Sequence, residues 1–367
     1  MSELILINVS GRDMPGLTSE ITGIMARYQI RILDIGQAVI HDHLTWGILI
    51  EVPNEKDSSL VMKDMLFRMH ELRLSVNFQP VSNENYQQWL DGKGKARYIV
   101  SLLSRSITAE QIARVSAITA KNGLNIDSIA RLSGRPPLLQ DLASSQACIE
   151  FSVRGTAPDL DGLKSEFLHI ASELNVDIAF QEDTPYRRNR RMVVFDMDST
   201  LIDAEVIDEL AKEAGVGQQV SEITEMAMRG ELDFAQSFAR RVGLLKGLPE
   251  EVLEVVAQRL RLTEGAERLL RNLKKLGYKT AILSGGFTYF ARKLQAQLGI
   301  DYIFANELEI VDGRVTGRVT GQIVDGKRNA ELLEELAAKE NIGCQQVIAV
   351  GDGANDQIGR ASCRERV

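Results

Sequence analysis

Val193-Val194-Phe195-Asp196-Met197-Asp198-Ser199-Thr200 decides how this chain of 367 residues is interpreted. Its first three residues are apolar and two of them are β-branched, which predicts a buried parallel strand. Asp196 and Asp198 alternate, so both side chains point past the carboxyl end of that strand, where open α/β sheets bind ligands. Carboxylates this close repel each other unless a cation lies between them or one keeps a proton. The stretch predicts either Mg²⁺ beside a carboxylate nucleophile or two solvated turn aspartates before a helix.

Two later strands are also followed by polar, glycine-rich turns. Residues 279–283 predict a strand that ends at Ser284-Gly285-Gly286, where small residues let backbone amides and a hydroxyl approach a phosphate. That triplet alone is equally compatible with a tight strand-to-helix turn. Residues 346–350 predict another buried strand, followed by Gly351-Asp352-Gly353-Ala354-Asn355-Asp356. Because open α/β sheets bind ligands at the carboxyl ends of their strands, the three turns predict one site.

A helical insertion separates the first two of these strands. Residues 201–215 predict a helix after the aspartates, and apolar residues at helical spacing continue to about residue 262. An all-helical insertion over about 206–262 can act as a lid that excludes water. Residues 301–309 and 314–323 predict a β-ribbon, and residues 327–339 a further helix.

The first half of the chain contains one pattern twice. The predicted elements over residues 4–79 follow the order β-α-β-β-α-β, the split ferredoxin-like arrangement, and the order recurs over residues 98–181. The polar residues 82–95 between the copies predict a linker. The expected fold class is α/β, with two ferredoxin-like α+β domains followed by a Rossmann-like domain that carries the helical insertion.

The composition excludes several classes of protein. A net charge of −8 gives no general electrostatic case for nucleic acid or an anionic membrane. Cys148, Cys344 and Cys363 lie far apart, which predicts neither a metal cluster nor a disulfide framework. With no signal segment and no apolar run of about 18 residues, we expect a cytoplasmic protein. The arginine-rich residues 186–191 predict a solvated linker.

Taken together, Asp196-x-Asp198-x-Thr200, Ser284-Gly285-Gly286 and residues 351–356 resemble the haloacid dehalogenase superfamily of phosphotransferases. Glu205 and the helical insertion narrow the resemblance, which covers residues 192–356, to the phosphoserine phosphatase branch. The resemblance implies a Mg²⁺-dependent phosphomonoester hydrolase. It would convert O-phospho-L-serine to L-serine and phosphate, the last step of serine biosynthesis.

The resemblance also implies the chemical roles of the acidic residues. Asp196 would be the nucleophile that forms an aspartyl-phosphate, and Asp198 would be the general acid and then the general base. Asp196, Asp352 and the carbonyl of Asp198 would hold Mg²⁺, with Asp356 supporting them.

The resemblance places the substrate among further residues. Glu205 would bind its ammonium group and Arg241 its carboxylate, while Met228 and Phe234 close over it. The phosphoryl side would be formed by Ser284, Gly285 and Asn355.

A second resemblance concerns the first copy of the ferredoxin-like pattern. Gly11-x-Asp13-x-Pro15-Gly16-Leu17-Thr18, followed by Ile32-Leu33-Asp34-Ile35-Gly36-Gln37, resembles an ACT domain, a small amino-acid-sensing module. In that family the backbone of the Asp-x-Pro-Gly-Leu turn binds effectors, which implies an amino-acid effector here. The second copy has Ser104-Arg105-Ser106-Ile107-Thr108 instead. The alternative is that both copies only pack or dimerise, and we expect a homodimer.

The chain departs from the phosphatase pattern at a cation. The family uses a lysine against the phosphate and nucleophile, and ungapped alignment puts Asn329 at that position. Lys327 is the expected substitute, because its long stem can redirect the charge by several ångströms.

The end of the chain also departs from the family pattern. Residues 358–367 lack apolar periodicity and resemble the translation of a sequencing adapter, so we expect a non-native tail on a truncated chain; a genuine polar tail is the alternative. The expected segments are an ACT domain at 1–81, an ACT-like domain at 96–183, a linker at 184–191, a phosphatase domain at 192–357 and the tail. Two other functions stay open: a catalytically impaired amino-acid-sensing or interaction protein, and a phosphatase of another small phosphomonoester.

Overall fold

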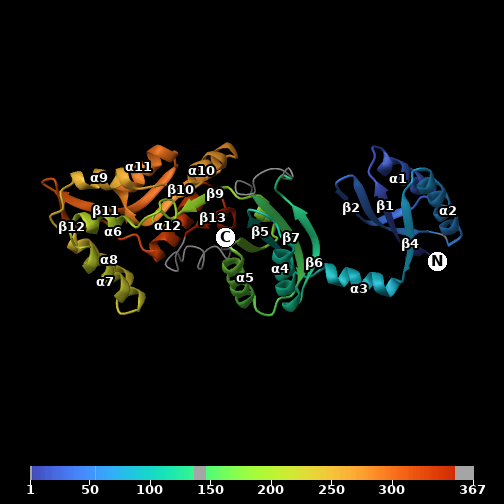
Figure 1. Cartoon of the computed structure of the whole chain (residues 1–367), viewed down its shortest axis with the longest axis horizontal. Coiled ribbons are helices and arrows are strands. Elements are labelled where there is room, and N and C mark those ends of the chain that lie inside the picture. The colour runs from blue at the N-terminus through green and yellow to red at the C-terminus, as the bar shows by residue number, and fades with distance from the viewer. Residues whose placement is uncertain (1, 54, 136–145, 352–367) are drawn as a thin grey trace. The chain divides into compact units, whose positions relative to one another are not determined.

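The computed structural model describes residues 2–53, 55–135 and 146–351 of the chain, coloured along the sequence in Figure 1. The chain divides into two compact units, one up to Lys95 and one from Ala96 onward. Within the described residues, no helix is both long and apolar enough to cross a lipid bilayer.

The first unit contains a four-stranded antiparallel sheet with two helices packed on it. Its elements are β1 (Glu3–Arg12), α1 (Leu17–Arg27), β2 (Arg31–Ile40), β3 (His43–Val52), α2 (Glu55–Glu71), β4 (Ser75–Val81) and α3 (Asn83–Lys93). The strand order β2-β3-β1-β4 confirms the ferredoxin-like prediction. Alternating residues of β1 and β3, such as Ile7 and Trp46, are buried against Ile21 of α1 and Met65 of α2.

The polar segment between the two copies forms a helix. Ser82 precedes α3, and its side chain accepts a hydrogen bond of 3.1 Å from the Asn85 amide. This N-cap satisfies a backbone donor that the first helical turn leaves open, so a polar sequence still starts a helix here. The segment predicted as a linker over residues 82–95 therefore contains a helix, whose formation the sequence analysis did not predict.

The second unit begins with a repeat of the same topology. Its elements are β5 (Arg97–Ser104), α4 (Ala109–Lys121), β6 (Leu124–Arg131), β7 (Ala147–Gly155), α5 (Leu160–Leu174) and β8 (Asp177–Glu182). The order β6-β7-β5-β8 matches that of the first copy strand for strand. A short helix, η2 (Pro185–Arg188), follows in the arginine-rich segment.

A five-stranded sheet organises the remainder of the second unit. Its strands are β9 (Met192–Phe195), β10 (Lys279–Phe287), β11 (Tyr302–Val311), β12 (Arg314–Thr320) and β13 (Val347–Val350), in the order β12-β11-β10-β9-β13. β10 and β13 both pair in parallel with β9, so the chain changes direction across the sheet at β9. Ligand sites of α/β sheets form at such a switch point, beyond the carboxyl ends of the strands.

Helices cover both faces of this sheet, as Figure 1 shows. α10 (Ala266–Lys275) and α11 (Thr288–Leu298) lie on one face, and α12 (Gly326–Lys339) on the other, before η3 (Cys344–Gln346). Val193 and Phe195 point to the first face, while Met192 and Val194 point to the second. Burial on both faces explains why the opening strand is apolar without alternation.

The insertion after β9 is helical, as predicted. It contains α6 (Val206–Glu213), α7 (Gly217–Met228), α8 (Phe234–Leu244) and α9 (Glu251–Arg259), here called the cap. The helix expected from residue 201 begins only at Val206, because residues 201–205 form a turn in which Ile202 bridges to Leu262. Ser284-Gly285-Gly286 also differs from expectation: it lies within β10, whose pairing with β11 shifts register there.

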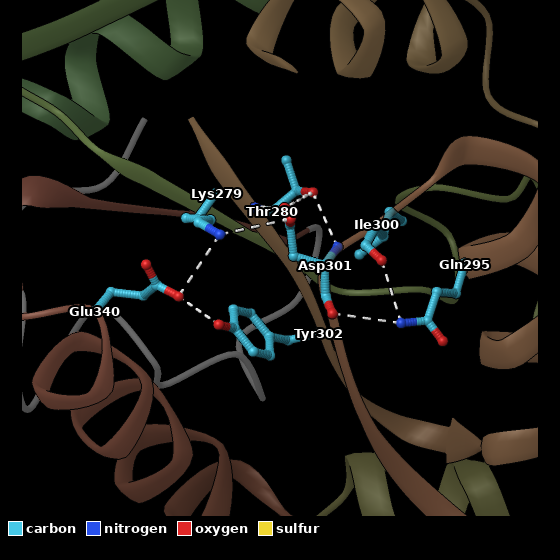
Figure 2. Close-up of polar contacts among 7 residues, drawn as sticks. All are labelled: Lys279, Thr280, Gln295, Ile300, Asp301, Tyr302 and Glu340. Atoms are coloured by element: carbon cyan, nitrogen blue, oxygen red, sulfur yellow. Dashed lines mark hydrogen bonds and ion pairs between the residues drawn. The ribbon is translucent and has the colours of Figure 1, made fainter. Parts of the chain in front are cut away.

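Polar contacts fix the amino ends of β10 and β11 (Figure 2). The Asp301 carboxylate accepts hydrogen bonds from the Thr280 amide, at 2.8 Å, and from its hydroxyl, at 3.0 Å. The Lys279 ammonium lies 3.9 Å from Asp301 and 3.8 Å from Glu340. The Tyr302 hydroxyl donates to Glu340. These residues tie the start of the sheet to the end of α12.

Candidate active site

A tight turn presents the two aspartates at the end of β9. The Asp196 amide still donates to the Val350 carbonyl at 2.8 Å, so this residue is the last to continue the pairing with β13. The Met197 carbonyl accepts from the amides of Leu201 and Ile202, which closes the turn. Met197 is fully buried, and both flanking aspartates line one cavity.

Asp198 lies in an environment that favours its protonated form. Burial, first of all, and then the negative charges of Glu205 and Asp196 raise the pKa of Asp198 well above its usual value. The Val206 amide, at the start of α6, donates to the carboxylate at 3.2 Å and opposes this shift. A carboxyl group that keeps its proton can act as a general acid.

A cavity of about 900 Å³ lies between the strand ends and the cap. Its wall contains every candidate site residue within the described part of the chain: Asp196, Asp198, Glu205, Met228, Phe234, Arg241, Ser284, Gly285 and Lys327. Asp352, Asn355 and Asp356 lie outside the described residues. Residues as far apart in the sequence as Asp196 and Lys327 therefore meet at one place.

The β10 wall approaches Asp198 closely. A Cβ atom on Gly286 would lie 2.7 Å from Asp198 Oδ2 and 2.5 Å from Met197 Cε, so a larger residue there would displace one of these side chains. Ser284 is buried, and its Oγ accepts from the Gly286 amide at 3.0 Å. The approach of a phosphate to this triplet stays a prediction.

Asn306 of β11 joins two walls of the cavity. Its Nδ2 donates to the Gly285 carbonyl at 2.8 Å, and its Oδ1 accepts from the Val324 amide at 2.8 Å. The side chain is 2% exposed, and both of its partners line the cavity. Sequence analysis missed this residue, although a polar amide inside a predicted strand was the available signal.

Charged residues of opposite sign meet at the cap end of the cavity. Glu205 precedes α6 and accepts from the Ser199 hydroxyl at 2.7 Å, and Asp208 lies one turn further along. Burial lowers the pKa of Arg241 on α8, while Asp208 and then Glu205 oppose that shift. Asp208 was also missed by sequence analysis, although its i+3 spacing from Glu205 places it on the same helix face.

Phe234 and Met228 occupy different positions. The Phe234 ring stacks on Phe238, with centroids 5.8 Å apart, and reaches to within 3.2 Å of where a Gly285 Cβ would lie. The cap thus touches the β10 wall through Phe234. Met228, at the end of α7, is 83% exposed and lies at the rim of the cavity.

The amino end of α12 contributes one cation and one amide. Lys327 is exposed to the cavity, and no described residue forms an ion pair with it. Asn329 is 4% exposed, and its Oδ1 has no hydrogen-bond partner among the described residues. Asp325 caps the helix by accepting from the Arg328 amide at 2.8 Å, which fixes the direction of this turn.

The charges of the cavity suit a cation. Its wall carries Asp196, Asp198, Glu205, Asp208 and Asp325 against Arg241 and Lys327. Carboxylate oxygens are ligands that Mg²⁺ prefers, and a phosphate dianion entering this acidic cavity requires positive charge beside it. Within the described residues no three acidic, His or Cys side chains form a complete ligand set, and the expected contributors Asp352 and Asp356 lie outside them. The residues present fit a divalent cation.

Family comparisons match three segments of the chain. Residues 191–362 match the haloacid dehalogenase-like hydrolases. Residues 3–79 and residues 96–181 each match an ACT domain.

Curated relatives extend over most of the chain. It is 39% identical over 352 residues to the phosphoserine phosphatase of Streptomyces coelicolor, covering 96% of this chain and 82% of that protein. It is 37% identical to phosphoserine phosphatase SerB2 of Mycobacterium tuberculosis, covering 96% and 83%. The phosphoserine phosphatase of Archaeoglobus fulgidus is 52% identical over 210 residues, which are 57% of this chain and 61% of that protein.

Two solved structures resemble the chain in both fold and sequence. A haloacid dehalogenase family hydrolase from Salmonella enterica serovar Typhi has a TM-score of 0.57 and 31% identity, covering 72% of this chain and 88% of that one. A probable phosphoserine phosphatase from Vibrio cholerae has a TM-score of 0.54 and 36% identity, covering 74% and 77%.

Proposed function

The chain belongs to the phosphoserine phosphatases of the haloacid dehalogenase-like hydrolases, and we propose that it hydrolyses O-phospho-L-serine to L-serine and phosphate, the last step of serine biosynthesis. The observation that carries this proposal is the cavity itself. It has two adjacent aspartates at a strand end and charges of both signs at the cap end. A phosphorylated zwitterion has matching groups at its two ends.

The two aspartates divide the chemistry between them. The Asp196 carboxylate attacks phosphorus, and the bond from phosphorus to the serine oxygen breaks while Asp198 gives that oxygen its proton. Asp198 then removes a proton from water, which attacks the aspartyl-phosphate and releases phosphate and the Asp196 carboxylate. The raised pKa of Asp198 supports its acid role in the first half of this cycle.

Asp196, the carbonyl of Asp198, Asp352 and Asp356 would hold Mg²⁺. When bound, the ion supplies positive charge against the transferring phosphoryl group, whose transition state spreads negative charge over its oxygens. Ser284 and Gly285, which line the cavity, orient the phosphoryl group, and Asn355 would assist them.

The cap end of the cavity selects the amino-acid part of the substrate. Glu205 offers a negative charge to the ammonium group and Arg241 a positive charge to the carboxylate. Phe234 covers the substrate from the cap, and Met228 lies over it at the rim of the cavity.

Lys327 supplies the cation that the family places at position 329. It lines the cavity from the first turn of α12, and no described residue pairs with it. Asn329 lies buried two residues later, and its neutral amide cannot supply this charge.

The test of this function is release of phosphate from O-phospho-L-serine with Mg²⁺, beside O-phosphothreonine and phosphates without an amino group. Preferential turnover of phosphoserine supports the proposal. Preference for another phosphomonoester would redefine the substrate, and no turnover of any compound by the intact chain would favour the alternative of a sensor.

We also propose that the first ACT domain binds an amino-acid effector and the second does not. Gly16 precedes α1 as its N-cap, in a left-handed conformation with φ 93°, and no described side chain caps the open amides of the helix. In the second copy Thr108 and Gln111 cap α4 reciprocally, and Gln111 also donates to Ser104 at 3.2 Å. The equivalent backbone groups are therefore already satisfied in the second copy.

Calorimetric titration of the intact chain with L-serine, glycine and each other proteinogenic amino acid tests the effector site. Gly16→Val, which strains the left-handed turn, is expected to abolish binding, while the matched Ser106→Val of the second copy leaves it unchanged. Equal loss in both variants would contradict the assignment.

A cytoplasmic homodimer completes the proposal. β2 is an edge strand of the first sheet, and it exposes Ile35 by 50% and Ile40 by 75%. Unpaired apolar edges favour association with another chain. Ile35→Lys is expected to convert the dimer to a monomer in analytical ultracentrifugation, whereas a monomeric unsubstituted chain would refute the assembly.

A further inference from the structure

Ser237 is a buried hydroxyl that the local structure of the cap leaves unsatisfied. It lies on α8, is 1% exposed and lines the cavity. Its Oγ has no hydrogen-bond partner among the described residues. Buried polar atoms are nearly always hydrogen-bonded, because an unmade bond leaves the desolvation of the group uncompensated. Ser237 therefore lacks a partner that a ligand can provide.

A second hydroxyl in the same cavity shows that the lack of a partner is not imposed by helical geometry. Thr224 lines the cavity from α7, and its Oγ1 donates to the Val220 carbonyl one turn earlier, at 3.0 Å. A serine or threonine in a helix commonly satisfies itself in this way. Ser237 does not, although the carbonyl of Asp233 lies one turn before it and accepts from the Ser237 amide at 2.9 Å.

Arg241 follows Ser237 by one helical turn and also has a buried polar atom without a hydrogen-bond partner. Residues at i and i+4 lie on the same face of a helix, and both line the cavity. The Arg241 Nε is buried without a hydrogen-bond partner, and no described carboxylate lies within ion-pair distance of the guanidinium. Asp208 and Glu205 act on it only at longer range.

The chemistry of these two groups defines the ligand group. The guanidinium carries only donors and a positive charge, which excludes an ammonium group and calls for an acceptor with negative charge. A carboxylate has two oxygens with four lone-pair positions. It can therefore accept two hydrogen bonds from the Arg241 guanidinium and one from the Ser237 hydroxyl. The phosphoryl group belongs at the opposite wall, beside Asp196 and Ser284.

We propose that Ser237 donates a hydrogen bond to the carboxylate of the substrate and, with Arg241, forms the subsite that selects phosphorylated α-amino acids over phosphorylated amines. This inference rests on the proposed function and adds a specificity-determining residue to it. Ser237 acts on binding, not on the transfer of the phosphoryl group.

The experiment compares two ligands that differ by the carboxylate. O-phospho-L-serine and O-phosphoethanolamine are titrated calorimetrically, with Mg²⁺, into the intact chain carrying Asp196→Asn, which prevents turnover. The dissociation constant of O-phosphoethanolamine divided by that of O-phospho-L-serine, here called the ratio, measures carboxylate recognition. Inorganic phosphate replaces O-phosphoethanolamine as the reference if the latter binds too weakly. Ser237→Ala is expected to reduce the ratio by about tenfold or more, since the bond joins a charged group.

Thr224→Val is the matched control, because it removes a cavity hydroxyl that is already satisfied within the protein. It is expected to leave the ratio unchanged. Thermal unfolding of the free protein separates recognition from structure: Ser237→Ala removes an unsatisfied group, so its melting temperature is expected to stay the same or rise. Ser237→Cys, with a similar size and a weak donor, is expected to lie between serine and alanine.

An unchanged ratio in Ser237→Ala, or an equal fall in affinity for both ligands, would overturn the inference. A lowered melting temperature with an unchanged ratio would show a structural role instead. Failure of the proposed function is distinguishable, because it appears as absent turnover of phosphoserine by the unsubstituted chain, whereas this test measures binding alone.

Discussion

The two ends of the five-stranded sheet carry the same types of residue in opposite arrangements. At the amino ends of β10 and β11, Asp301 accepts two hydrogen bonds from Thr280, and Lys279 lies between Asp301 and Glu340 (Figure 2). At the carboxyl end of β9, Asp198 accepts a hydrogen bond from the Val206 amide, and burial, followed by its acidic neighbours, raises its pKa. At the first end a cation lies between the two carboxylates, while at the second end Glu205 and Asp196 repel the charge of Asp198.

This difference indicates that the amino ends of β10 and β11 stabilise the fold, whereas the carboxyl end of β9 binds a ligand. At the amino end each residue drawn in Figure 2 makes at least one polar contact, including Gln295, whose amide nitrogen donates to the carbonyls of Ile300 at 3.1 Å and Asp301 at 3.4 Å. Such satisfied networks hold a structure together. Uncompensated carboxylates reduce stability and persist where a ligand or cation supplies the missing charge.

The largest expected effect lies at the carboxyl end. Asp196→Asn is expected to reduce phosphoserine turnover by about 10³-fold or more, because the amide cannot form the aspartyl-phosphate. Phosphate release with Mg²⁺ measures it, and circular dichroism verifies that the fold is kept. Turnover at the unsubstituted rate would remove Asp196 from the mechanism.

A smaller loss is expected from the cation at α12. Lys327→Ala should lower turnover by about 10²–10³-fold, the usual effect of removing one electrostatic group from a transition state. Arg328→Ala is the matched control, since that side chain pairs with Glu331 and Glu335 on the same helix. Adding Asn329→Lys to Lys327→Ala should restore activity, and a failure of Lys327→Ala to slow turnover would reject this lysine.

The wall between the strand ends should show an intermediate effect. Asn306→Ala leaves the Val324 amide and the Gly285 carbonyl without their partner, so we expect turnover to fall by about tenfold and stability by about 1–3 kcal/mol. Steady-state kinetics and urea unfolding measure the two effects. A stable variant with full turnover would show that the two walls hold their positions independently.

The amino end should respond in the reverse manner. Asp301→Ala leaves the buried Thr280 without its acceptor, which is expected to lower the free energy of unfolding by about 1–3 kcal/mol. Turnover at saturating substrate should stay within about twofold. Glu267→Ala, which removes an exposed helical ion pair with Arg271, is the control and should change neither quantity. If Asp301→Ala lost turnover without losing stability, the purely structural role of the amino ends would be contradicted.

The smallest expected effect is a gain of stability at the carboxyl end. The pKa of Asp198 in the folded protein is raised above its usual 3.8, so folding favours the protonated carboxyl group. The stability that Asp198 contributes is therefore fully present below pH 3.8 and is lost as the pH rises through the pKa of the folded state. Asp198→Asn stays neutral, so without Mg²⁺ it should stabilise the protein by about 0.5–2 kcal/mol at pH 7 and not at all near pH 3. Urea unfolding at both pH values, with a chelator, measures this; equal effects at both would contradict the raised pKa.

Much of the fold was determined by local sequence. The periodicity of residues 4–79 and 98–181 predicted both ferredoxin-like copies, because each strand buries one face and alternates accordingly. The apolar run before Asp196 predicted a strand buried on both faces. Capping was harder to predict: a single side-chain bond from Ser82 makes α3 a helix, and Ile202 bridging to Leu262 delays α6.

The sequence by itself determined the identities of the reacting groups, since two aspartates at a strand end, a glycine-rich strand and a helical insertion appear as short motifs. Only the tertiary structure brought Ser237 and Asp208 to the same cavity, and Asn306 to two of the residues that line it. Their roles depend on which partners they find or lack across the fold. A hydroxyl satisfied within its own helix, as at Thr224, and one left unsatisfied, as at Ser237, look the same in sequence. Packing decides between them, because it fixes which donors face the protein and which face the substrate.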